Sequence, residues 1–163
     1  MAKWTMEGMS DYIAYLQRIG VETNEIIGAG VYAMAEVVTD KIRKNLDALP
    51  TVTNAANIAT YKKGYSRLSD MEKKGLLDGL GVSPMQDDNG YKNVKVGFDG
   101  YNSVKTQKYP KGQPNVLIAR ITESGSSYRE KTPFIRPALR QTQNEALKKG
   151  QKAIEEKIKQ AEK

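Results

Sequence analysis

Residues 91–98, YKNVKVGF, decide the class of fold, because this stretch has the pattern of a strand in a chain whose other patterns are mostly helical. Its large apolar residues, Val94, Val96 and Phe98, occupy every second position. The side chains of a strand point alternately to its two faces, so the alternation predicts a strand over Tyr91–Phe98 with one buried face. The fold is therefore expected to contain a small, mostly antiparallel sheet.

Two long helices are predicted to pack on this sheet. Apolar residues recur at three- to four-residue steps from Ile27 to Leu49, and Pro50 ends the pattern. Pro137 suits the first turn of a closing helix whose apolar stripe continues to Ile158. Residues 1–163 are thus expected to form a single α+β domain, with a long helix from the amino-terminal half and a long carboxy-terminal helix.

Shorter helices are predicted over residues 11–19 and near 69–80. Residues 115–124 also favour a helix, although their β-branched content fits a strand. Gly28 and Gly30 lie inside the long amino-terminal pattern. They mark either a late helix start or a place where another backbone approaches closely, and we favour close packing.

Segments with few large apolar residues are predicted to be mobile loops. These are residues 51–67 and residues 99–115, which are expected to become ordered when the protein docks to a partner. The end of the last helix, residues 155–163, is rich in Lys and Glu and is expected to fray.

The composition excludes several classes of function. The 163 residues include no Cys and no His, which removes thiol nucleophiles, disulfides, Cys/His zinc sites and triads with an imidazole base. Neither a GxxxxGK nor an HExxH motif is present. We expect no cofactor, no metal site and no enzymatic activity. The amino terminus lacks the apolar run of a signal peptide and no segment has membrane-spanning length, so we expect synthesis in the cytoplasm of the cell that makes the protein and no membrane contact.

The net charge of +7 is unevenly distributed, with an acidic excess in residues 1–60 and a basic excess after them. This asymmetry fits nucleic-acid binding, a passage lined for nucleic acid, or a ring in which the acidic part of one copy meets the basic part of the next. A lysine-rich surface also serves solubility alone.

Two blocks follow the predicted strand: ITESGSS, residues 121–127, and KTPFIRPAL, residues 131–139. This order of blocks resembles the neck or tail-completion family of long-tailed bacteriophages, the gene-ten-like putative tail components. The resemblance covers roughly residues 9–150 and is strongest in 94–139. It implies a structural virion protein that joins the head connector to the tail, in a hexameric ring with other neck and tail proteins as partners.

The resemblance implies that the acidic-glycine turn of the first block holds the shape of the protomer near the ring contact. Thr122 departs from the larger apolar residue expected there. In the second block, prolines fix an extended entry on either side of Phe134, which either packs under the last helix or contacts a partner. The predicted partner interface contains Tyr101, Lys105, Tyr109, Glu123, Gly125, Pro133, Phe134, Ile135, Arg136 and Pro137.

Other functions remain open at this point. A tail terminator or minor tail protein has the same sequence features as a joining protein. Tyrosines mixed with lysines in the loops also fit a small basic protein that binds DNA without sequence preference, or passive contact with DNA that passes through a ring. Such residues in loops are more often an ordinary interface or a solvated face.

Overall fold

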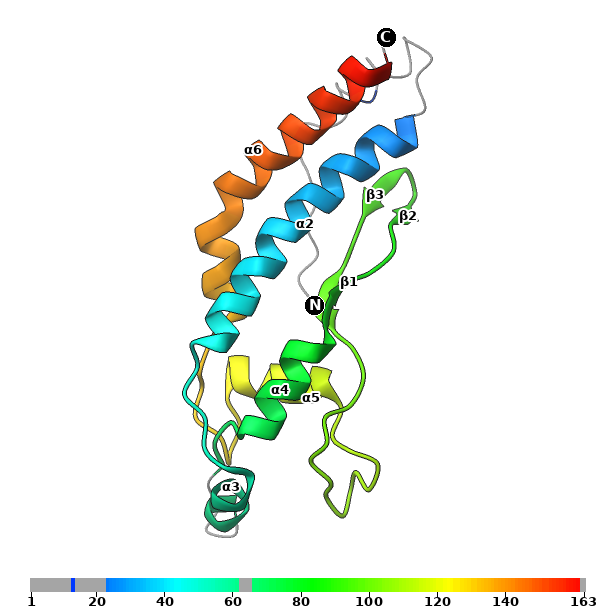
Figure 1. Cartoon of the computed structure of the whole chain (residues 1–163). Helices are drawn as coiled ribbons and strands as arrows, with labels where there is room; N and C mark the ends of the chain where they lie inside the picture. The colour runs from blue at the N-terminus through cyan, green and yellow to red at the C-terminus, as the bar shows by residue number, and fades with distance from the viewer. Residues whose placement is uncertain (1–12, 14–22, 62–65, 162–163) are drawn as a thin grey trace. The chain divides into compact units, whose positions relative to one another are not determined.

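The computed structural model describes residues 13, 23–61 and 66–161 (Figure 1). Its elements in chain order are α2 (Thr23–Asp47), α3 (Asn54–Tyr61), α4 (Asp70–Gly79), β1 (Leu80–Val82), β2 (Gln86–Asp88), β3 (Tyr91–Asn93), β4 (Val96–Phe98), α5 (Asn115–Ser124) and α6 (Ile135–Ala161). Two long helices accompany small antiparallel pairs of strands, which confirms the predicted α+β class. The described helices include none that is long and apolar enough to cross a membrane.

Four predicted helices are confirmed. Helices α2 and α6 are the two long ones, and α4 and α5 occupy the ranges predicted near 69–80 and over 115–124. Ser69 caps α4: its side chain accepts a hydrogen bond from the Glu72 N–H, and the Glu72 side chain accepts one from the Ser69 N–H. Apart from Ile13, the predicted helix over 11–19 lies outside the described residues.

The prediction of one strand over Tyr91–Phe98 is wrong in detail. The segment forms two strands with different partners, because β3 pairs with β2 and β4 pairs with β1. Asn89 and Gly90 both have positive φ, 56° and 89°, which is the requirement of a tight two-residue hairpin turn. On the opposite side of the ribbon Pro84 lies between β1 and β2, and it has no N–H to donate to a continuous ladder.

The prediction that residues 51–67 form a loop is also wrong in part, since α3 occupies Asn54–Tyr61. Residues 99–115 contain no regular element before α5 begins at Asn115, as predicted. At the other end of the chain, α6 continues as a helix through Ala161, so much of the segment 155–163 is helical.

Contacts divide the chain into two compact units, a finer division than the single domain expected from length. The first unit contains the part of α2 that ends at Val38, the segment Val82–Val96 and the part of α6 from Thr142. The second contains Thr39–Gly81 and Gly97–Gln141.

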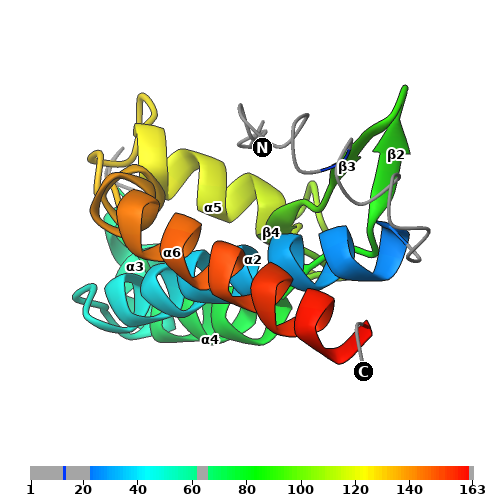
Figure 2. The ribbon, with the colours of Figure 1, turned by 90° about the horizontal axis from the view of Figure 1, so that it is seen from above.

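In the first unit the end of α6 runs antiparallel to the start of α2 (Figures 1 and 2). The two backbones come close together. A Cβ atom at Gly30 would lie 2.6 Å from Ile154 Cγ1, and one at Gly150 would lie 3.1 Å from the carbonyl oxygen of Gly30. Gly30 is therefore a site of close approach, as favoured from the sequence. The pair is also joined by an ion pair of 2.7 Å between Lys149 and Glu36.

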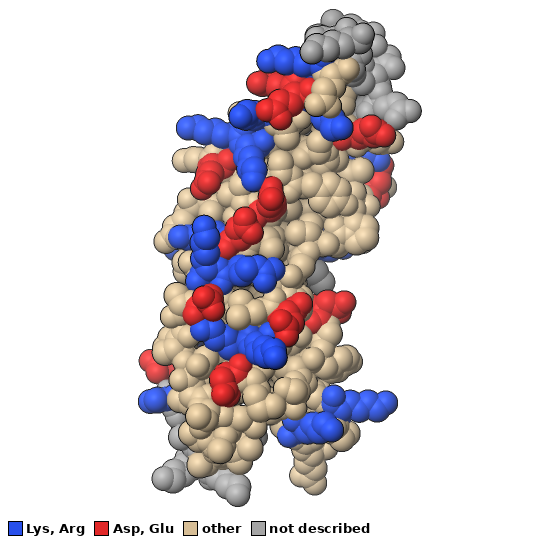
Figure 3. Space-filling model, in the orientation of Figure 1, with Lys and Arg blue, Asp and Glu red and all other residues tan. Residues whose placement is uncertain are grey.

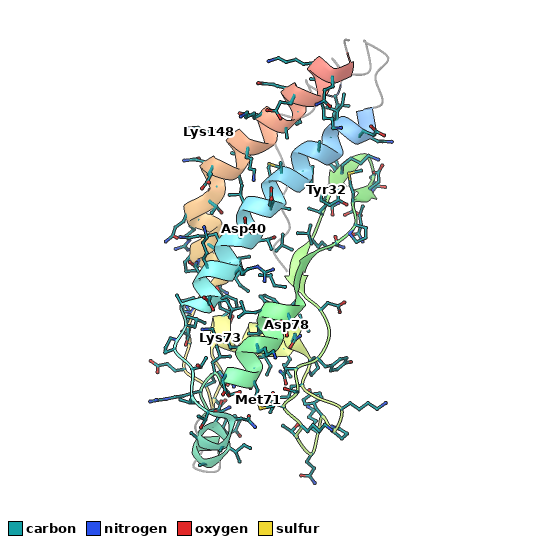
Figure 4. The ribbon with its side chains drawn as sticks, in the orientation of Figure 1. Tyr32, Asp40, Met71, Lys73, Asp78 and Lys148 are labelled. Atoms are coloured by element: carbon teal, nitrogen blue, oxygen red, sulfur yellow. The ribbon has the colours of Figure 1, made fainter. Side chains whose placement is uncertain are left out.

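The β2–β3 hairpin belongs to the same unit and is attached to α2. The Tyr32 hydroxyl accepts a hydrogen bond of 2.8 Å from the Met85 N–H, and Figure 4 shows Tyr32 directed from α2 toward the hairpin. A Cβ atom at Gly28 would meet Met85 Sδ at an ordinary contact distance of 3.5 Å. At the turn, the Lys92 side chain and then the Gly90 N–H hold the pKa of Asp87 below its usual value by hydrogen bonding to its carboxylate.

The second unit packs α4 against α5 and against the last turns of α2. The Arg43 guanidinium donates to the Leu77 carbonyl at 3.1 Å, and the Lys73 ammonium donates to the Leu49 carbonyl at 3.1 Å. The most deeply buried apolar side chains of this unit are Leu46, Leu76, Ile118, Phe134 and Ala138.

Candidate functional site

The residues predicted to form a partner interface all belong to the second unit, within Gly97–Gln141. Helix α5 links their two groups in the chain, since it begins at the end of loop 99–115 and ends just before Gly125. Phe98, at the end of β4 directly before the loop, contacts the second group: its ring and that of Phe134 are 5.9 Å apart and edge to face. The structure thus brings the end of β4 beside the block at residues 131–139.

Glu123 makes the connection between α5 and α6. Its carboxylate is buried and accepts hydrogen bonds from the backbone N–H groups of Phe134 (2.7 Å), Ile135 (2.8 Å) and Arg136 (3.0 Å). These groups open the first turn of α6, where helical N–H groups have no partner within the helix and where the helix dipole favours a negative charge. Glu123 therefore caps α6 from the end of the preceding helix.

Gly125 allows the chain to leave α5 at this point. Its φ of 77° is in the left-handed region, and its N–H closes the helix by donating to the Ile121 carbonyl at 2.9 Å. A Cβ atom here would lie 3.2 Å from Lys131 Cβ and 3.3 Å from the Arg129 carbonyl oxygen. A larger residue would disturb the path from α5 to α6.

The residues of the second block, KTPFIRPAL, differ in how deeply they are buried. Phe134 is 1% exposed, so its side chain is part of the chain's own core, and its carbonyl accepts a hydrogen bond from the Asn45 side chain at 3.1 Å. Ile135 and Pro137 are half-buried in the first turn of α6, whereas Pro133 is exposed. Pro137 at this position confirms the prediction of a proline in the first helical turn.

Arg136 is an exposed cation of the block. Its side chain is 57% exposed, and its Nε lies 3.8 Å from the Glu123 carboxylate. Arg140 is one turn further along α6 and is also exposed. Both guanidinium groups are exposed, whereas the Glu123 carboxylate that holds the connection between α5 and α6 is buried.

Loop 99–115 presents Tyr101, Lys105 and Tyr109. Tyr101 is 68% exposed and lies opposite Pro114 at the base of the loop. Lys105 is exposed and Tyr109 is half-buried at the tip. The base rests on α4, because a Cβ atom at Gly79 would collide with the Asp99 carbonyl oxygen.

A buried polar cluster in the same unit was not predicted. Arg129 donates to both carboxylate oxygens of Glu72, at 2.9 and 3.0 Å, to the Ser66 hydroxyl at 3.2 Å and to the Thr122 hydroxyl at 3.3 Å. Thr122, unexpected from the resemblance, therefore supplies one of the two hydroxyl acceptors of this guanidinium. The motif Ser69-x-x-Glu72 could have indicated the capping part of the cluster, but nothing in the sequence pairs Glu72 with Arg129, 57 residues away.

The buried carboxylates of Glu72 and Glu123 both accept hydrogen bonds from donors of this chain. We call the Arg129 cluster and the Glu123 cap together the scaffold. The scaffold fixes the segment between α5 and α6 and with it the outward position of Arg136. Comparisons with protein-family models, with curated proteins and with solved structures find no match for this chain.

Proposed function

We propose that the chain is a structural virion protein of a long-tailed bacteriophage, a neck or tail-completion protein that joins the head connector to the tail as part of a ring. The resemblance of the blocks at 121–127 and 131–139 suggests this role. The observation that carries the proposal is the Glu123 cap, because through it the first block binds the backbone of the second block directly.

The members of the predicted interface have two different tasks in this proposal. Glu123, Gly125 and Phe134 act from inside the unit and hold the connection between α5 and α6 in one shape. Arg136 and Tyr101 are exposed and are available to partners. An exposed arginine and an exposed tyrosine are typical of the residues that dominate protein interfaces.

The mechanism is binding geometry rather than chemistry. Several copies, in a hexameric ring, dock to other neck and tail proteins through repeated contacts. Each contact is weak by itself, and the linked copies together bind strongly. The protein is made in the host cytoplasm and ends in the neck of the virion.

Electron microscopy of lysates tests this proposal. A phage that encodes the chain is grown with its gene deleted, with and without the protein supplied in trans. We expect filled heads beside finished but unattached tails, and attached tails after complementation. Overlong tails would identify a tail terminator instead, and normal infectious particles from the deletion phage would contradict a role in the neck.

A further inference from the structure

Loop 99–115 is held on a frame of its own backbone hydrogen bonds. The Asn102 N–H donates to the Gln113 carbonyl at 2.9 Å, and the Gln113 N–H donates to the Val104 carbonyl at 3.1 Å. Val104 is buried within the second unit. The two sides of the loop are therefore tied together, and its tip is presented in a defined position.

The tip is a tight turn that carries cations. Thr106 and Tyr109 exchange backbone hydrogen bonds of 3.1 and 3.0 Å. Lys105, Lys108 and Lys111 surround this turn and are exposed. We call these three lysines the cationic tip. The Lys108 ammonium lies 5.6 Å from the centre of the Tyr109 ring, a distance at which the ring attracts the charge.

The cationic tip is not neutralised by its surroundings. Residues 100–122 contain no Asp or Glu, and no ion pair links the three lysines to a carboxylate within the described part of the chain. Figure 3 shows blue atoms at the end of this loop without red atoms beside them. Four lysines elsewhere are paired: Lys73 with Asp47, Lys92 with Asp87, Lys149 with Glu36 and Lys152 with Glu156.

We propose that the cationic tip binds the phosphate backbone of duplex DNA without reading its sequence. Lysine is a compact, hydrated point charge that suits phosphate contacts, and such contacts need only a properly placed charge. Lys105 and Tyr109 of the tip belong to the partner interface predicted from the sequence, but a tip formed by three lysines fits a protein partner less well, because lysine is depleted at protein interfaces. The exposed large apolar side chains nearest in sequence, Tyr101 and Val116, lie at the base of the loop and not at its tip.

This inference goes beyond the proposed function, since the isolated chain can bind DNA whether or not it forms a ring. Its failure would leave the role in the neck untouched. Conversely, DNA binding by the tip would stand even if deletion of the gene left virions intact.

Salt-dependent fluorescence anisotropy with a labelled DNA duplex of random sequence tests the proposal. The loop variant is K105Q/K108Q/K111Q, and the matched control is K148Q/K157Q/K159Q, which removes the same charge from exposed positions on α6. For the wild type we expect a straight line of log K against log salt concentration. The slope should become shallower by about 2 to 3 in the loop variant, because each phosphate contact contributes about 0.9. The control should keep the wild-type slope.

Two results would overturn the proposal. Equal loss of slope in the loop variant and the control would show that net charge, not the tip, governs binding. A labelled polyglutamate peptide that binds the tip while the duplex does not would assign the tip to an acidic protein surface. Thermal unfolding followed by circular dichroism should give both variants the wild-type Tm, because all six substituted side chains are exposed.

Discussion

Glu123 is the residue that connects the two blocks of the candidate site. One buried carboxylate accepts three backbone N–H groups at the start of α6 and lies 3.8 Å from the Arg136 side chain. Hydrogen bonds to a charged acceptor are roughly twice as strong as neutral ones. The sequence singled out Glu123, but its hydrogen-bond partners at the start of α6 depend on how the chain turns at Gly125.

The substitution Glu123→Gln tests this role. The amide keeps the size of the side chain, yet it removes the charge and places an N–H₂ group where a carboxylate oxygen accepted hydrogen bonds. We expect the free energy of unfolding to fall by roughly 1–3 kcal/mol. Urea unfolding measures the change. The matched control Glu155→Gln, at an exposed position on α6, should change stability by about 0.5 kcal/mol or less. Equal stabilities of the two variants would show that the cap contributes nothing.

Arg129 is a buried residue that the sequence did not indicate. A lone arginine in a polar stretch is expected on the surface, but Arg129 is 6% exposed. Its burial is possible because Glu72, Ser66 and Thr122 supply acceptors from separate segments. A buried charge requires such partners. They come together through tertiary packing, and no local pattern announces them.

At the scale of elements, the long helices were predictable, whereas the short helix α3 and the pairing of the strands were not. The apolar periodicity of α2 and α6 extends over many turns, so the pattern is strong. Strands β3 and β4 together cover a single alternating run, and the run gives no sign that they pair with different partners. The Asn89-Gly90 pair was the available signal for the hairpin turn.

The close contact of α2 and α6 in the first unit predicts that substitution by Ala lowers stability at one glycine of α2 and raises it at another. Gly30→Ala places a methyl group 2.6 Å from Ile154 Cγ1, so the helices must separate or Ile154 must shift. We expect a net loss of about 1–2 kcal/mol of stability from overpacking.

Gly28→Ala is the matched control, because its methyl group would meet Met85 Sδ at 3.5 Å. Removing a glycine from a helix interior should then stabilise the protein by up to about 1 kcal/mol. Thermal unfolding of the two variants measures the difference. A Gly30→Ala variant that is as stable as Gly28→Ala would contradict the close approach of the two helices.

At the scale of the whole molecule, the sequence predicted the α+β class and the long helices, whereas the two-unit organisation came from the structure. The boundaries of the units fall inside α2 after Val38, inside β1 before Val82, inside β4 after Val96 and inside α6 before Thr142. A linker rich in Gly or Pro would have signalled a boundary, but a continuous helix carries no such signal. The candidate interface residues nevertheless fall within one unit, as their closeness in the sequence suggested.

The proposed role in the neck is most directly tested by counting copies in the virion. Quantitative mass spectrometry of purified particles, with labelled peptides of this chain as standards, measures the number per particle. A hexameric ring predicts about six copies in each virion, in a fixed ratio to the other neck proteins. Absence from purified particles, when the protein is abundant in the lysate, would contradict the account.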